Sequence, residues 1–137
     1  MNTVKLPPWA APYALAVGLM DLTTGLALFL APGWTLARMG AVLPEAPALA
    51  YVRFCGPFVA AVGATYLLAL RRGGEPALRA ALGGTLVFRL AAGSGAAVSV
   101  AAGWLDLAWL VVAATDLGCA AAQAWVLRRW AAPGGGG

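Results

Sequence analysis

The sequence contains no histidine and only two cysteines, Cys55 and Cys119, in 137 residues. Haem and most zinc, copper or iron centres need histidine or a cluster of cysteines, so the chain is expected to hold no such metal or cofactor. Nucleophilic catalysis by a Ser–His or Cys–His pair is excluded because the general base is missing. These absences favour a protein without catalytic chemistry of its own.

Charged residues are also scarce: they make up 10% of the chain, apolar residues make up 62%, and the mean hydropathy is +0.83. Soluble domains are nearer about 45–50% apolar and about 25% charged. A soluble domain of this length has no means of burying so much apolar surface, whereas lipid removes the need to bury it. The sequence therefore predicts an integral membrane protein.

Four long apolar runs predict an all-α fold, an integral membrane four-helix bundle that forms one domain over residues 1–130. The predicted helices cover about 13–30, 54–70, 80–101 and 107–127. Each is close to the roughly 20 residues that cross about 30 Å of hydrocarbon. An aspartate at the centre of the first run argues against a cleaved signal peptide and favours a retained helix. The glycine-rich segment 131–137 is expected to be a flexible tail.

The basic residues are distributed unevenly between the two ends of this bundle. Six fall at the end shared by the N-terminal segment, the second connection and the C-terminus, and two fall at the opposite end. The six are Lys5, Arg71, Arg72, Arg79, Arg128 and Arg129, and the two are Arg38 and Arg53. By the positive-inside rule both termini are expected in the cytoplasm, with the protein in a bacterial inner membrane. The net charge of +4 is then matched by lipid headgroups, and nucleic acid is not an expected partner.

The connection 31–53 is the only long one, and its stretch 34–43 places Leu36, Met39 and Leu43 on one helical face. It is either a short helix lying in the membrane interface or a plain loop, since two prolines follow it directly. Arg53 at its end is expected to extend its guanidinium to the interface, or to contact an anionic ligand.

Three charged residues share one depth in the predicted bundle. Asp21 occupies the midpoint of the first helix, and Arg89 and Asp116 lie within about two residues of the midpoints of the third and fourth helices. A charge at mid-bilayer costs about 2.5–3.5 kcal/mol on insertion scales, so three unpaired charges would threaten a small bundle. The five N–H donors of Arg89 can serve both carboxylates. We therefore predict a buried Asp21–Arg89–Asp116 cluster.

The predicted lining of the cluster consists of residues one or two turns from these charges and, on the second helix, of a tyrosine one turn beyond Gly63. They are Thr24, Tyr66, Thr85, Cys119 and Gln123. Small residues on the same faces, such as Gly63 and Gly93, are expected to let the helices approach closely in lipid. For Cys119, a reactive thiol and a small apolar filler are the two alternatives.

Two roles are compatible with the predicted cluster. Buried Asp–Arg groups often do no more than fix helix register and the choice of partner helix. Two carboxylates and one guanidinium also leave one excess negative charge, so Asp21 or Asp116 is able to hold an exchangeable proton, as carboxylates do in proton-coupled carriers.

At "RFCGPFVAAVGATYLLAL", residues 53–70, the sequence resembles small four-helix bacterial membrane proteins of the DoxX-like kind. The shared features are an arginine before a helix with spaced glycines, here Gly56 and Gly63, and four helices in a chain of this length. The resemblance implies internal termini and, for some members, a link to quinone oxidation. It makes a quinone or another lipophilic molecule the expected ligand.

Two functions follow as expectations. The first is a membrane protein that catalyses nothing itself and acts as an accessory or assembly subunit, or as a binder of a small lipophilic ligand. The second is a proton-coupled small-molecule transporter with Asp21 or Asp116 as the proton site. One four-helix chain is too small to alternate access alone, so transport predicts a homodimer or a larger membrane complex.

Overall fold

The computed structural model describes residues 6–131, except for the side chains of residues 130 and 131. The elements are α1 (Ala10–Leu30), α2 (Pro32–Met39), α3 (Ala46–Arg72), α4 (Glu75–Ala101), the 3-10 turn η1 (Leu107–Trp109) and α5 (Leu110–Ala131). Among the described residues, four helical spans are long and apolar enough to cross a membrane. They are α1, α3, α4, and η1 together with α5. The predicted all-α fold with four spans is confirmed, and the chain is a multi-pass membrane protein. Of the predicted tail, residues 132–137 lie outside the described residues.

The second span begins earlier than predicted, at Ala46 rather than at residue 54. Pro47 lies in the first turn of α3, where a helix has no use for the missing N–H, so it starts the helix instead of preventing it. The connection before it is helical at 32–39, and this helix, α2, ends at Gly40 with φ 75°. Leu43 therefore lies beyond α2, not on the predicted face, and Leu36 is buried.

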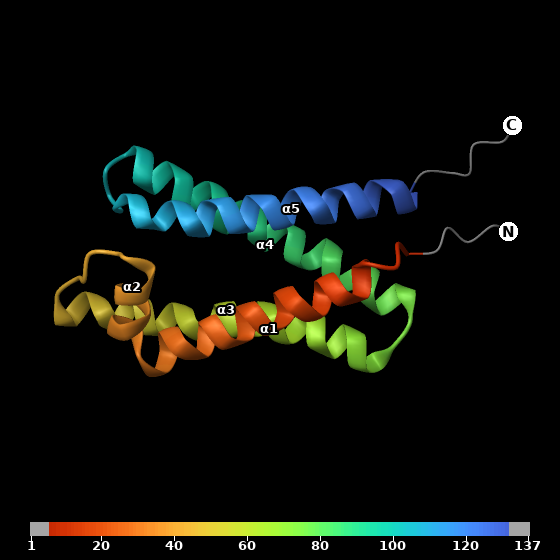
Figure 1. Ribbon diagram of the computed structural model, residues 1–137, viewed down its shortest axis with the longest axis horizontal. Coiled ribbons are helices and arrows are strands. Elements are labelled where there is room, and N and C mark those ends of the chain that lie inside the picture. The colour runs from red at the N-terminus through yellow and green to blue at the C-terminus, as the bar shows by residue number, and fades with distance from the viewer. Residues whose placement is uncertain (1–5, 132–137) are drawn as a thin grey trace, which may run out of the picture.

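The long helices form two antiparallel pairs, α1 with α3 and α4 with α5 (Figure 1). A tight turn between α3 and α4 connects the pairs, and it uses Gly73 and Gly74 at φ 70° and 87°, which other residues rarely adopt. Both ends of the described chain lie at the same end of the molecule as this turn (Figure 1), which we call the terminal end. We call the other end, which carries α2 and the α4–α5 connection, the α2 end.

Glycines set the spacing within the α1–α3 pair. A Cβ added to Gly25 would lie 2.6 Å from the carbonyl oxygen of Gly56, and one added to Gly63 would lie 3.0 Å from the Cβ of Asp21. Neither position has room for a side chain, so the two backbones are in direct contact. Helices in lipid usually associate by close approach through small residues, because apolar side chains gain little free energy when they exchange lipid contacts for protein contacts.

The two pairs pack together in the half of the molecule nearer the terminal end. Their common core consists of buried residues from all four long helices: Ala10, Ala14, Val17, Tyr66, Leu78, Leu82 and Val126. Trp9 stacks on Trp125 at this end, with ring centroids 5.8 Å apart. Nearby, the Tyr13 hydroxyl donates a hydrogen bond of 3.3 Å to the carbonyl oxygen of Cys119. These contacts close the terminal half of the space between the pairs.

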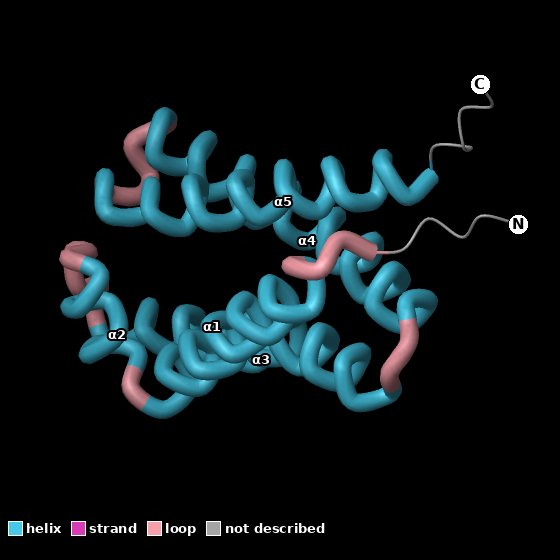
Figure 2. The backbone as a smooth tube through the Cα atoms, turned by 45° about the vertical axis from the view of Figure 1, so that its right-hand side comes forward, coloured by secondary structure: helices cyan, strands magenta, loops and turns pink. Residues whose placement is uncertain are grey.

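The pairs diverge in the half nearer the α2 end, as Figure 2 shows. They meet again at that end, where the Val42 N–H donates a 2.8 Å hydrogen bond to the carboxylate of Asp106. Asp106 also accepts from the N–H of Ala108 at 2.9 Å and so caps the 3-10 turn. The bundle thus has a packed terminal half and a divided half, which the Val42–Asp106 hydrogen bond bridges at the α2 end.

Candidate functional site

Arg89 lies where the packed half of the molecule gives way to the divided half. Its Nη2 donates to Asp21 and its Nη1 donates to Asp116, each over an N···O distance of 2.5 Å. Arg89 is 1% exposed. The predicted Asp21–Arg89–Asp116 cluster is therefore present, and it links α1 to α4 and α5. We refer to these three residues as the charge cluster.

Close-packed glycines bring the short aspartate side chains within reach of the guanidinium. A Cβ added to Gly93 on α4 would lie 3.1 Å from the Cβ of Asp116. On the other pair, Gly63 of α3 leaves space for the backbone of α1 beside Asp21. The small residues that the sequence places beside each charge thus perform the expected task of letting the helix backbones approach.

A chain of buried polar groups continues from the charge cluster towards the terminal end. The Nε of Arg89 donates to the Tyr66 hydroxyl at 3.1 Å, and the amide of Gln123 hydrogen-bonds to the same hydroxyl. Gln123 also lies 3.5 Å from the hydroxyl of Thr85. Tyr66 therefore brings in α3, the one long helix without a mid-membrane charge, and the polar network joins all four spans.

Four of the five predicted lining residues contribute to this region, and one does not. Tyr66, Thr85 and Gln123 are buried and hydrogen-bonded as described above. Cys119 is a partly buried free thiol that packs against the core. Thr24 is exposed, because it lies about 60° around α1 from Asp21 and falls beyond the edge of the buried face. Its prediction as a lining residue was wrong.

The charge cluster keeps two acceptors free. Each aspartate gives only one oxygen to Arg89, and its second oxygen accepts no hydrogen bond from the described residues. The side chains of Asp21 and Asp116 are 10% and 13% exposed, so these oxygens are not sealed in the interior. Formal charges of −1, +1 and −1 leave the cluster with an excess of one negative charge.

Gln123 supplies a third acceptor without a partner, deeper in the packed half. Its side chain is 0% exposed, and its Oε1 has no hydrogen-bond partner among the described residues. Buried polar atoms are nearly always paired, because an unpaired one loses its hydration without compensation. Three oxygens of this network, one each on Asp21, Asp116 and Gln123, thus accept no hydrogen bond from the described residues.

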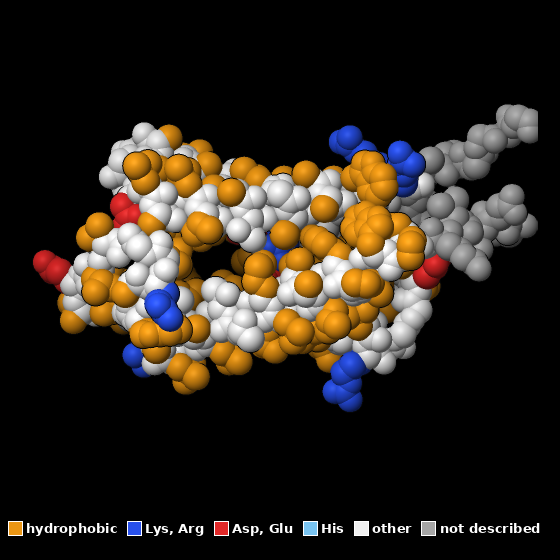
Figure 3. Space-filling view, in the orientation of Figure 1, with side chains coloured by type: hydrophobic (Ala, Val, Ile, Leu, Met, Phe, Trp, Pro, Cys, Tyr) orange, Lys and Arg blue, Asp and Glu red, His pale blue; other side chains and the backbone are white. Residues whose placement is uncertain are grey.

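The divided half of the molecule contains open space beside the charge cluster. Figure 3 shows the molecule hollowed between the two pairs, with basic and acidic side chains at the edge of the hollow. At the α2 end the space includes a cavity of about 500 Å³. Its lining comes from both pairs: Leu36, Val42, Pro44, Ala48, Val52, Gly103, Trp104, Leu105, Asp106 and Trp109. We call this space the inter-pair opening, and its lining at the α2 end is mainly apolar.

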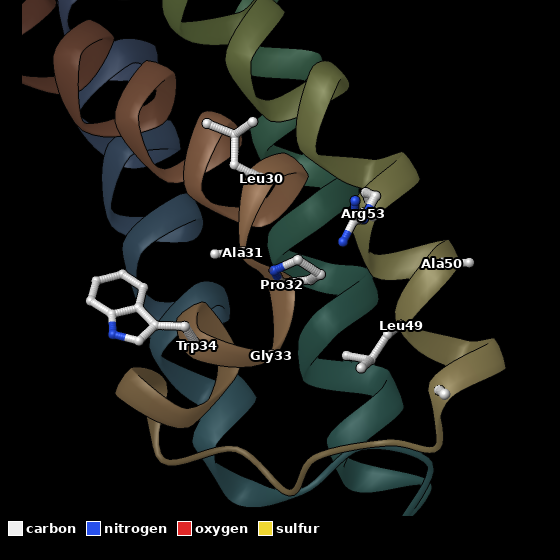
Figure 4. Close-up of a pocket in the computed structure, with 9 residues that line it drawn as sticks. Leu30, Ala31, Pro32, Gly33, Trp34, Leu49, Ala50 and Arg53 are labelled. Atoms are coloured by element: carbon white, nitrogen blue, oxygen red, sulfur yellow. The ribbon is translucent and has the colours of Figure 1, made fainter.

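A separate pocket of about 460 Å³ lies at the α2 end, between α3 and the junction of α1 with α2. Arg53 points from α3 towards Pro32 across this pocket (Figure 4). It is the only charged residue of the lining, and its side chain is exposed, as expected for an arginine that reaches the membrane surface. This pocket is open and lacks convergent polar groups, so the charge cluster is the stronger candidate site.

No protein-family model, curated protein or solved structure matches the chain. The geometry of the charge cluster and of the inter-pair opening therefore carries the functional argument.

Tyr66 offers a first test of this network. Substituting Tyr66→Phe keeps the ring in the core but removes the acceptor for the Nε of Arg89 and the partner of Gln123. We expect a loss of about 1–3 kcal/mol in the free energy of unfolding, because two buried polar groups lose a partner. Thermal unfolding in mild detergent measures it, with Tyr51→Phe on the exposed surface as the matched control. Equal stability of the two variants would show that the hydroxyl is not part of the network.

Proposed function

We propose that the chain is a bacterial inner-membrane protein with both termini in the cytoplasm, and that it binds a small lipophilic ligand without chemically changing it. One observation carries the proposal: the divided half holds a mainly apolar cavity at the α2 end and, at its other side, a buried polar cluster with free acceptors. Ligand sites in proteins typically combine apolar walls with a few convergent polar groups. Because the opening lies among membrane-spanning helices, a ligand dissolved in the bilayer has direct access to it.

The charge cluster has a structural part in this proposal. The pairs diverge beyond Arg89, so the two ion pairs hold α1 to α4 and α5 at the point where apolar packing ends. The ligand would occupy the space that this arrangement keeps open. An accessory or assembly subunit fits the same geometry, with the ligand or a partner helix completing the divided half. The DoxX-like resemblance supports a lipophilic ligand, and quinones are one class it includes.

Filling the opening is the direct test. Val52 lines the cavity at the α2 end, so Val52→Trp adds bulk inside it, whereas Val87→Trp adds the same bulk on an exposed face of α4. The protein is purified in lipid nanodiscs, and bound small molecules are identified by native mass spectrometry. We expect a lipophilic molecule to be retained by the wild type and by Val87→Trp, and to be lost from Val52→Trp. A wild type that retains nothing, or three identical profiles, would contradict ligand binding in the opening.

A proton-coupled transporter that acts as a dimer is the second candidate, and the excess negative charge of the cluster favours it. If Asp21 or Asp116 carries the proton, Asp21→Asn and Asp116→Asn should abolish substrate movement driven by a pH gradient in proteoliposomes, at unchanged protein levels. If the cluster only holds the helices, the same substitutions should lower the amount of folded protein instead.

A further inference from the structure

We infer that the ligand is a lipophilic cation: an amine or onium group that pairs with the free carboxylate oxygens of Asp21 and Asp116, carried on an apolar body that lies in the inter-pair opening. This inference rests on the proposed function and specifies its ligand class. It depends on the groups that the site leaves free, on the charge of the cluster and on the position of the opening.

The site leaves two carboxylate acceptors free. Arg89 donates to Asp21 and Asp116 through its two terminal nitrogens and to Tyr66 through Nε, so each nitrogen of the guanidinium already has a partner. The second carboxylate oxygens of both aspartates accept nothing from the described residues, although each side chain keeps some exposure. A ligand that offers only neutral acceptors, such as the carbonyls of a quinone, could reach the remaining N–H groups of Nη1 and Nη2 but would leave the excess negative charge of the cluster uncompensated. A ligand with N–H donors or a positive charge would find two carboxylates.

Charge points to the same class of ligand. The cluster carries one excess negative charge at the level where Arg89 spans the two pairs, and a charge in the hydrocarbon region is costly. One monovalent cation between the carboxylates would make the site neutral. The Oε1 of Gln123, unpaired and fully buried on the terminal side of the cluster, adds a further partial negative charge nearby.

The apolar body of the ligand is inferred from the opening itself. At the α2 end it holds a mainly apolar cavity of about 500 Å³, within the roughly 300–1,000 Å³ of typical ligand sites. The packed core closes the other direction, towards the terminal end. A ligand that reaches the carboxylates must therefore leave its remaining bulk in the divided half, beside apolar side chains.

Binding of four probes to the full-length protein in phosphatidylcholine nanodiscs tests this inference. The probes are tetraphenylphosphonium (cationic and lipophilic), triphenylphosphine oxide (neutral), tetraphenylborate (anionic) and tetramethylammonium (cationic but small). We expect saturable binding of tetraphenylphosphonium above the level of empty nanodiscs. The other three probes should bind at least about tenfold more weakly, the difference expected for losing one charged pairing or the apolar contact.

Variants locate the site on the chain. Asp21→Asn and Asp116→Asn each remove one negative charge from the cluster and should weaken tetraphenylphosphonium binding at least about tenfold. Glu45→Gln removes the same charge at an exposed position and should leave binding unchanged. If either cluster variant fails to fold, the comparison of the four probes on the wild type still decides the question.

The outcomes separate this inference from the proposed function. Tight binding of tetraphenylphosphonium alone, lost in the cluster variants, supports both. Equal binding of the neutral and cationic lipophiles, still blocked by Val52→Trp, would overturn the cationic ligand and keep the lipophilic site. Equal binding of tetramethylammonium would overturn the apolar requirement. If no probe binds saturably, while the purified wild type retains a bound molecule of another class, the cationic inference fails alone. If nothing binds or is retained, both fail.

Discussion

Replacing Arg89 with glutamine should be the most damaging single substitution in this chain. It leaves the largely buried Asp21 and Asp116 without their shared cation. Removing one partner of a buried ion pair typically costs about 3–5 kcal/mol, and Arg89 serves two such pairs. We expect Arg89→Gln to be strongly depleted from the membrane fraction, and any purified protein to unfold at a much lower temperature than the wild type.

The matched controls separate loss of charge balance from loss of packing. The triple variant Asp21→Asn, Arg89→Gln, Asp116→Asn keeps the side chains similar in size but leaves no charge, so it should recover most of the lost stability. Arg53→Gln removes a cation from an exposed position and should have little effect. A triple variant as unstable as Arg89→Gln would show that the guanidinium is needed for its shape and hydrogen bonds, not for neutralising two carboxylates.

The second large effect is expected at Gly25, on the contact between α1 and α3. In Gly25→Ala the new Cβ would lie 2.6 Å from the carbonyl oxygen of Gly56 and 2.7 Å from the Cα of Ala60. Both neighbours are backbone atoms of α3, so no side chain can rotate away and the helices must separate. Overpacking of this kind costs about 1–3 kcal/mol, and a backbone clash belongs at the upper end. Chemical denaturation in detergent measures the loss.

Gly95→Ala on α4 is the control for this substitution. A Cβ at Gly95 would meet nothing within 4 Å, so the only change is the better helix propensity of alanine. We expect Gly95→Ala to be neutral or slightly stabilising, and Gly25→Ala to be clearly destabilised. If the two variants behave alike, α1 and α3 do not touch through their glycines, and the pairing of the helices would have to be different.

Much of the candidate site can be predicted from the sequence, because a residue's position along a membrane-spanning helix gives its depth in the bilayer. Span lengths fix the depth of each residue, and three charges at one depth in lipid have a strong reason to pair. This is why Asp21, Arg89 and Asp116 could be grouped without any knowledge of helix order. Tyr66 could be added because a polar group one turn from Gly63 shares its face. Its place as the partner of the Arg89 Nε could not be specified.

The remaining features depend on which helices pack against each other. The residue pattern within a single helix does not give this information. All four spans carry small residues, so the sequence does not say that α1 packs along α3 and α4 along α5, or that the pairs diverge towards the α2 end. The inter-pair opening is therefore a finding of the structure. The early start of α3 was missed because prolines before a span resemble a loop, although Pro47 is compatible with the first turn of a helix.

The central claim is that Arg89 binds both aspartates at once within the bilayer, and solid-state NMR of the protein in lipid measures this directly. Labelling the arginine terminal nitrogens with ¹⁵N and the aspartate carboxyl carbons with ¹³C makes each ion pair visible as a dipolar coupling. The chain has three aspartates, and Asp106 lies at the α2 end with backbone partners, so it is the internal control. We expect short-range couplings to Asp21 and Asp116 and none to Asp106, with both lost in Arg89→Gln. A coupling to only one of the two aspartates, or to neither, would contradict the bridge between the helix pairs.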